Sequence, residues 1–135
     1  MRRSGIKRKT PLKRVRPVKQ TINRAASEAW ARGVRTKRCA LCGANGVHGH
    51  HIITQQQLRI AAFSLRLDFE RLRWDTRNRL ALCPRHHAAH HARSHPVPWV
   101  VLEQHAPKVF QFAREIGLEW WLEAMYPPER LERAA

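Results

Sequence analysis

The chain has 135 residues, of which 26 are Lys or Arg and 10 are Asp or Glu, so its formal net charge is +16. This length favours one domain with tails and a modest core. A positive charge of this size attracts polyanions, above all nucleic acid, and exceeds what solubility alone requires. No apolar run is long enough to cross a bilayer, and no secretory signal precedes the basic start, so we expect a cytoplasmic protein.

Residues 1–22 form a basic arm that contains no acidic residue and is broken by Pro11 and Pro17. Because the arm has little apolar surface to bury, we expect it to be disordered in isolation. Its charges would contact phosphates without choosing a sequence, and an inert solvated tail is the alternative. The arm residues assigned to nucleic-acid binding are Arg8, Lys9, Lys13 and Arg14.

The first predicted helix covers residues 24–33, which are rich in good helix formers and end at Gly33. Ala26, Ala29 and Trp30 lie along one stripe of this helix. We therefore assign Trp30 to the core.

Three cysteines, an odd number without a secretory signal, favour metal binding over disulfides. Cys39-Ala-Leu-Cys42-Gly43 has the outline of a zinc knuckle, with a glycine that permits the tight turn. A lone C-x-x-C is a weak signal, but Cys83-Pro-Arg-His86 supplies a matching C-x-x-H. Together they make a closed Cys₃His set, the composition of a structural zinc site. Unrelated buried cysteines are the alternative.

A histidine-rich segment, His48-Gly-His50-His51, follows the knuckle. Adjacent residues of a strand point to opposite faces, so one of His50 and His51 can bind a metal while the other faces substrate. Residues 54–74 then predict a single long helix with Thr54 as its N-cap, because apolar residues recur at three- and four-residue steps. The positions assigned to the core are Leu58, Ala61, Ala62, Leu65 and Phe69.

Residues 78–82 predict a short strand, and the proline that soon follows suits the first turn of a helix. On that helix His87 and His91 lie four residues apart and share one face, where they can hold one ion. The same spacing recurs on a neighbouring face in His86 and His90. Two such faces indicate two ions, or one ion and one substrate.

The C-terminal part is predicted to be helical and aromatic. Residues 96–98 break the preceding helix, and Trp99-Val-Val-Leu102 is a short apolar run. A helix then opens at Pro107 and closes at Gly117, followed by an aromatic segment over 118–126. Because these rings lie among acidic residues, we assign them to closing the core or a dimer face rather than to stacking on bases.

In order, the chain carries C-x-x-C, then His-His, then Trp-Asp-x-x-Asn, then Leu-Cys-x-x-His-His-x-x-x-His. Over residues 36–95 this pattern resembles the HNH endonucleases of the ββα-metal (His-Me finger) type, in the zinc-knuckle form common in phage and mobile-element proteins. The resemblance implies a helix-rich α+β fold with one folded domain over 23–135, in which 96–128 close the motif core. A hairpin would carry the histidine pair, and a helix would carry His87 and His91.

The resemblance also implies roles for individual residues. His51 resembles the general base, and Asn78 resembles the residue whose side chain braces the loop that bears it. His87 and His91 are similar to the two metal ligands on the family's helix, and His50 matches the ligand just before the base.

The implied activity is hydrolysis of phosphodiester bonds in DNA, with duplex DNA as the expected partner. A neutral imidazole can accept a proton from water near neutral pH, and one cation held by three histidines can act as Lewis acid and template. Mg²⁺, Mn²⁺, Ni²⁺ and Zn²⁺ are all candidates for that ion. An arginine would stabilise the developing phosphate charge, and the sequence does not choose among Arg79, Arg85 and Arg93.

Two other functions stay open. A non-catalytic, zinc-stabilised DNA-binding module explains the charge and the knuckle equally well, but leaves His51, Asn78, His87 and His91 without a role. A metal-dependent hydrolase acting on RNA is a weaker alternative, since nothing in the sequence reads a 2′-hydroxyl. One departure from the family is His86, where a fourth cysteine is usual; zinc accepts imidazole as well as thiolate.

Overall fold

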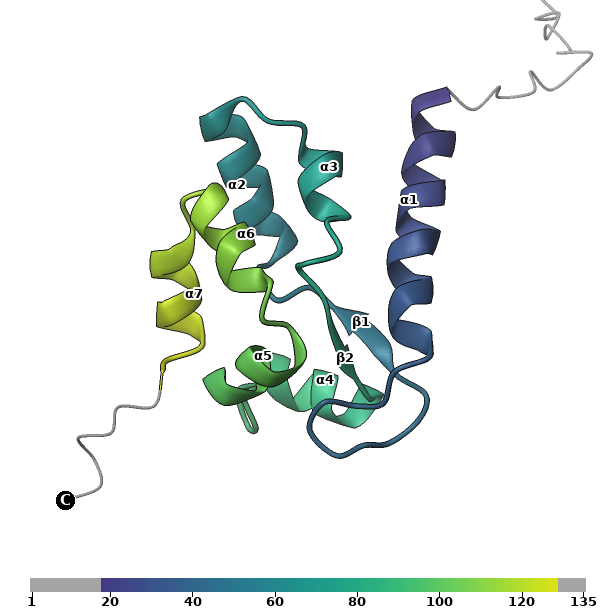
Figure 1. Cartoon of the computed structure of the whole chain (residues 1–135), viewed down its shortest axis with the longest axis vertical. Coiled ribbons are helices and arrows are strands. Elements are labelled where there is room, and N and C mark those ends of the chain that lie inside the picture. The colour runs from purple at the N-terminus through teal and green to yellow at the C-terminus, as the bar shows by residue number, and fades with distance from the viewer. Residues whose placement is uncertain (1–17, 129–135) are drawn as a thin grey trace, which may run out of the picture.

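The computed structural model describes residues 18–128 and shows a helix-rich α+β fold with one small sheet, as predicted (Figure 1). The elements in chain order are α1 (Val18–Arg35), β1 (His48–His50), α2 (Gln55–Leu65), α3 (Phe69–Arg73), β2 (Leu80–Leu82), α4 (Pro84–His91), α5 (Trp99–His105), α6 (Val109–Glu115) and α7 (Glu119–Met125). Within this part of the chain, no helix has the length and apolar character that a bilayer-spanning segment needs.

The sheet has two antiparallel strands, and their register sets which side each histidine faces. His48 pairs with Leu82, Gly49 with Ala81 and His50 with Leu80. Since neighbouring residues of a strand point to opposite faces, Gly49 and His50 face different helices. Figure 1 shows α1 on one side of the two strands and α2, α5, α6 and α7 on the other side.

Helix α1 packs on the sheet through Trp30 and Val34, which are 4% and 2% exposed. Gly49 makes this close approach possible, because a Cβ at that position would lie 2.3 Å from the Trp30 ring. The indole Nε1 donates a hydrogen bond to the Asp75 carbonyl at 3.2 Å. Trp30 is therefore a core residue, as the sequence predicts.

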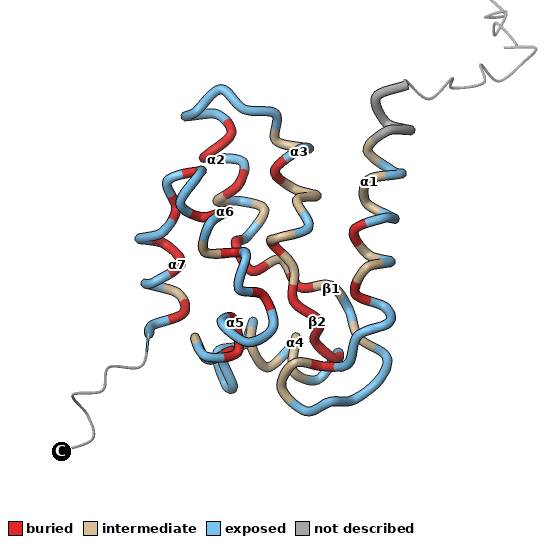
Figure 2. The backbone as a smooth tube through the Cα atoms, in the orientation of Figure 1, coloured by how far each residue is buried: buried red, intermediate tan, exposed pale blue. Residues whose placement is uncertain are grey.

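Helix α4 is the exception among the helices in how it is held in place. Figure 2 shows buried residues concentrated on the strands and on the inner sides of α2, α6 and α7. No residue of α4 is buried, although Cys83 at its N-cap is. Apolar packing contributes little to its position, so other contacts must fix it.

Two predicted helices have different bounds in the structure. The helix predicted over 54–74 is two helices, because Arg66 adopts a left-handed conformation (φ 55°) that ends α2. Asp68 then caps α3 by accepting from the Glu70 N–H at 3.2 Å. The chain turns away after Leu65, which is 47% exposed rather than in the core.

Helix α1 begins at Val18 rather than at residue 24, so residues 18–22, assigned to the disordered arm, are helical instead. The predicted hairpin is also different, because α2 and α3 lie between its two strands in the chain. The C-terminal region follows the prediction more closely, with a turn at Gly117 between α6 and α7. The apolar run at residues 99–102 is the start of helix α5.

Candidate metal centres

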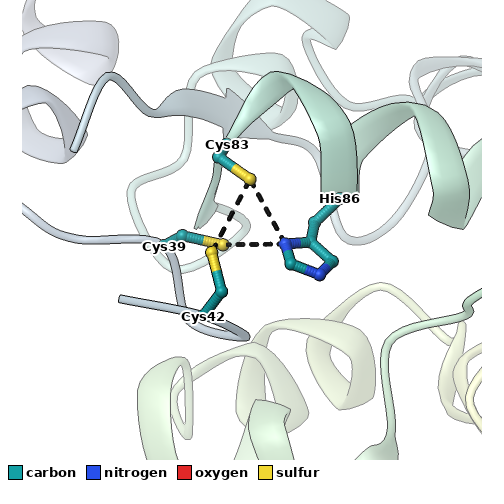
Figure 3. A group of neighbouring side chains, drawn as sticks. All are labelled: Cys39, Cys42, Cys83 and His86. Atoms are coloured by element: carbon teal, nitrogen blue, oxygen red, sulfur yellow. Dashed lines mark hydrogen bonds between the residues drawn. The ribbon is translucent and has the colours of Figure 1, made fainter. Parts of the chain in front are cut away.

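Four side chains converge where the chain before β1 meets the start of α4 (Figure 3). The Cys42 and Cys83 sulfurs lie 3.8 Å apart, and His86 Nδ1 lies 3.2 Å from Cys83 Sγ and 3.7 Å from Cys39 Sγ. Tetrahedral zinc with Zn–S bonds of about 2.3 Å separates its sulfur ligands by about 3.8 Å, whereas a disulfide needs about 2.05 Å. The three thiols are free, and the Cys₃His set could hold a metal such as zinc.

Local backbone structure places these four ligands. The Gly43 N–H donates to the Cys39 carbonyl at 2.8 Å in a turn that Gly43 completes at φ 73°, a conformation that favours glycine. The Ala40 N–H donates to the Ala81 carbonyl at 2.9 Å, which ties this turn to β2. Cys83 is the N-cap of α4, so His86 stands one turn into the helix on the same side. A metal bound by this group would join the start of α4 to the turn before β1.

The pKa shifts of Cys42 and Cys39 have opposite directions. A backbone hydrogen bond from Ala44 favours the Cys42 thiolate, but burial and the neighbouring thiols outweigh it and raise the pKa of Cys42. Burial opposes ionisation of Cys39, but backbone hydrogen bonds, the largest from Cys83, outweigh it and lower the pKa of the thiol to about 6. Zinc binds the thiolate form, and a lowered pKa makes that form available near neutral pH.

A second group of possible metal ligands combines two residues of α4 with one residue of β1. His50, His87 and His91 offer ring nitrogens that all lie within 4.8 Å of one another. The Nε2 atoms of His87 and His91 are 2.9 Å apart, close to the spacing of neighbouring ligands about 2.1 Å from one cation. The spacing of four residues on α4 therefore brings the two rings together, as predicted from the sequence.

The environment of this group favours the neutral, metal-binding form of imidazole. Burial, followed by the nearby His90, His87 and His91, lowers the pKa of His50 to about 2. Burial and then His91 also lower the pKa of His87. At pH 7 both rings are uncharged, and a neutral ring nitrogen is the donor that a divalent cation requires.

His51 lies beside this group but on the other face of the strand. Its ring stacks on Trp30 with centroids 4.3 Å apart, and its Nε2 lies 3.0 Å from the Arg73 carbonyl oxygen. A carbonyl can only accept, so Nε2 carries the hydrogen and Nδ1 keeps a lone pair in the neutral ring. Burial lowers the pKa of His51, although the Arg73 hydrogen bond opposes this shift. His51 is thus a neutral ring with a defined tautomer.

Asn78 braces the backbone just beyond His51. Its side chain is fully buried, accepts from the Ile53 N–H at 2.7 Å and donates to the Ile53 carbonyl at 3.0 Å. The amide therefore fixes both polar groups of one residue in the turn between β1 and α2. This geometry matches the bracing role that the sequence resemblance implies.

Four of these histidine rings open onto one cleft. A cavity of about 550 Å³ is lined by His50, His51, His87 and His91. Ser27, Trp30 and Ala31 of α1 also line this cleft. The three-histidine group and His51 therefore line the same cleft.

The three candidate arginines lie in different places. Arg79 donates to the Trp30 carbonyl at 2.9 Å and does not line the cleft. Arg85 is exposed on α4. Arg93 lines a smaller cavity, about 150 Å³, together with His50 and His91. Only Arg93 of the three is therefore beside the three-histidine group. The four basic residues of the arm, Arg8, Lys9, Lys13 and Arg14, lie outside the described residues.

His90 and Tyr126 have contacts that the sequence did not predict. His86 and His90 do not act as one ligand face, as their spacing indicated, because His86 joins the three cysteines. His90 does not join a metal group among the described residues; its Nδ1 accepts from the Val97 N–H at 3.0 Å. Its Nε2 lies 3.2 Å from the Tyr126 hydroxyl, which also lies 3.0 Å from His50 Nε2. Tyr126 was assigned only to the aromatic closure, and no spacing rule links it to β1.

The chain matches no family model, no curated protein and no solved structure.

Proposed function

We propose that this protein is a metal-dependent endonuclease of the HNH type, which hydrolyses phosphodiester bonds in DNA. The single observation that carries the proposal is the shared cleft of His50, His87, His91 and His51. A three-histidine group alone would suit many metal proteins. The free imidazole beside it, held as one tautomer, adds the base that hydrolysis requires.

The arrangement of elements supports the same proposal. Strands β1 and β2 and helix α4 form a small unit, with the Cys₃His set joining the helix to the turn before β1. Two paired strands followed by a helix are what we would expect of a ββα-metal core, here with α2 and α3 inserted between the strands. The formal net charge of +16 suits a polyanionic substrate, and DNA is the polyanion that the family resemblance implies.

His51 would act as the general base. Its Nε2–H is engaged with the Arg73 carbonyl, so the Nδ1 lone pair is free to take a proton from water. The water oxygen then bonds to phosphorus while the bond from phosphorus to the 3′-oxygen breaks. A divalent cation on His50, His87 and His91 would supply charge relief at the phosphate and at the departing oxygen.

Arg93 would complete the site by stabilising the charge that develops on the phosphate. It lines the smaller cavity of about 150 Å³, which shares His50 and His91 with the larger cleft.

A plasmid-cleavage assay with the zinc-loaded full chain tests the proposal. We expect nicking or linearisation in the presence of Mg²⁺, Mn²⁺, Ni²⁺ or Zn²⁺, and none with EDTA. His51→Ala should lower the rate by at least about 100-fold, the usual contribution of a general base. Binding of the same DNA, measured by fluorescence anisotropy, should be retained.

The matched control is His105→Ala, which removes an exposed histidine on α5 that does not line the cleft. It should cleave at the wild-type rate. Equal behaviour of wild type, His51→Ala and His105→Ala across all four cations would reject the enzyme. DNA binding without cleavage would then identify a zinc-stabilised binding module.

A further inference from the structure

The Tyr126 hydroxyl occupies a buried position behind the three-histidine group. It follows the last turn of α7 and is 2% exposed, yet it reaches residues near β1 and on α4. Its oxygen lies 3.0 Å from His50 Nε2, 3.2 Å from His90 Nε2 and 3.2 Å from the Ile52 carbonyl oxygen. One hydroxyl therefore has three polar neighbours, two of them imidazoles.

The tautomer of His90 follows from its other neighbour. The Val97 N–H can only donate, and it points at His90 Nδ1 from 3.0 Å. An imidazole that accepts a hydrogen bond at Nδ1 has no proton there, so the ring is neutral. A neutral ring with a lone pair on Nδ1 carries its hydrogen on Nε2, and His90 donates to Tyr126.

The tautomer of His50 follows in turn. Tyr126 has one hydrogen, and the Ile52 carbonyl can only accept, so the hydroxyl donates to Ile52. The two lone pairs of the oxygen then accept from His90 Nε2–H and from His50 Nε2–H. Every donor in this network meets one acceptor. The lone pair of His50 is consequently on Nδ1, which has no hydrogen-bond partner within residues 18–128.

We propose that Tyr126 and His90 are positioning residues, which hold His50 as the tautomer whose Nδ1 is free to bind the cation. The inference rests on the proposed function only in taking the three-histidine group as a cation site. It gives the C-terminal helix a role in metal binding: α7 supplies the acceptor that orients a ligand on β1. Hydrogen bonds of this kind typically change metal affinity by about 10- to 100-fold.

The first test reads the tautomer directly. We expect long-range ¹⁵N–¹H NMR spectra of the zinc-loaded full chain to show His50 protonated on Nε2. In Tyr126→Phe the His50 signals should shift towards the other tautomer, because the acceptor is gone while the aromatic ring remains. A wild-type His50 protonated on Nδ1 would overturn the proposal, whatever the activity of the protein.

The second test measures Co²⁺ binding to the zinc-loaded chain by calorimetry. Tyr126→Phe and His90→Leu should both weaken Co²⁺ binding by about 10- to 100-fold and leave the zinc content unchanged. His90→Gln should retain most of the affinity, because its amide N–H can donate to Tyr126. Cleavage by Tyr126→Phe should recover at high metal concentration, which a merely structural defect would not allow.

His91→Ala separates the two proposals, since it removes a ligand rather than a positioning contact. If His91→Ala weakens Co²⁺ binding while Tyr126→Phe and His90→Leu bind as tightly as wild type, the positioning role is wrong and the cation site stands. If His91→Ala also binds Co²⁺ like wild type, the cation site itself is wrong.

Discussion

The two candidate metal centres take ligands from adjacent residues of α4, His86 and His87, but differ in ligand number, ligand type and exposure. The Cys₃His group, which includes His86, has four ligands and three sulfurs, and two of its cysteines are buried. The three-histidine group, which includes His87, has three nitrogen ligands and borders a cleft of about 550 Å³. Four protein ligands fill a tetrahedral zinc site, whereas three leave positions open for water or substrate.

The difference shows how a helix with no buried residue can still present ligands in fixed positions. Helix α4 has no buried residue, and its polar contacts include the Cys₃His group at its first turn and the His90 hydrogen bonds at its last. His87, which follows His86, points at the second group. One centre serves as the structural support of the other, and the expected effects of substitutions should follow that order.

Removing a ligand from each centre should give the largest contrast. Cys83→Ala should lose the zinc and most of the folded structure, because structural zinc contributes about 10–16 kcal/mol in small zinc domains. His91→Ala should keep the zinc and the fold, since His91 is exposed, and lose only DNA cleavage. Metal analysis and circular dichroism of both variants measure the difference. A stable, zinc-free Cys83→Ala protein would contradict this division of roles.

Acid should lower the free energy of unfolding through protonation of His50 in the unfolded chain. In the unfolded chain its pKa is 6.5, and burial lowers it to about 2 in the folded protein. The unfolded state therefore binds more protons below pH 6.5, and stability falls as the pH drops from 6.5 towards 2. At pH 5.5 the loss from this one group is about 1.4 kcal/mol.

Urea unfolding between pH 7.5 and 5.5, with one equivalent of zinc and no other divalent cation, measures this slope. His50→Gln is the matched variant, because it removes the titrating ring and should give a flatter profile. Identical slopes for wild type and His50→Gln would show that His50 is not held neutral.

The smallest expected effect is at Arg93, where one substitution should raise stability and lower activity. Arg93→Gly should raise the free energy of unfolding by about 1 kcal/mol, because glycine adopts φ 56° without strain. Cleavage should nevertheless fall by about 10-fold or more through loss of the charge near the phosphate. Arg66→Gly is the control: it relieves the same conformation (φ 55°) at the end of α2. It should be equally stabilised and cleave normally, and a parallel loss of activity in both variants would remove Arg93 from the site.

Much of the site could be predicted because its residues obey local rules. C-x-x-C and C-x-x-H spacings each place two ligands on one turn, and His87 and His91 share a helix face at four residues. Strand alternation separated His50 from His51 correctly, as their different neighbours show. The nuclease activity and the choice of ion stay predictions.

The residues that could not be predicted depend on contacts between distant parts of the chain. Tyr126 reaches His50 only after α5, α6 and α7 have packed, and no periodicity encodes that approach. The choice of Arg93 over Arg79 required knowing that the latter bonds to the Trp30 carbonyl. Asp68, which caps α3, is a weak sequence signal for the break at Arg66, because aspartate is a common N-cap. The apolar periodicity over 54–74 favours a continuous helix instead.

Gly49 has a consequence that reaches beyond its own strand. A single methyl group there would collide with the Trp30 indole, and the same indole supports the His51 ring from 4.3 Å. The orientation of His51, the proposed base, therefore depends partly on the absence of a side chain at Gly49. Of the three residues of this strand, the one without a side chain therefore determines how closely α1 can approach.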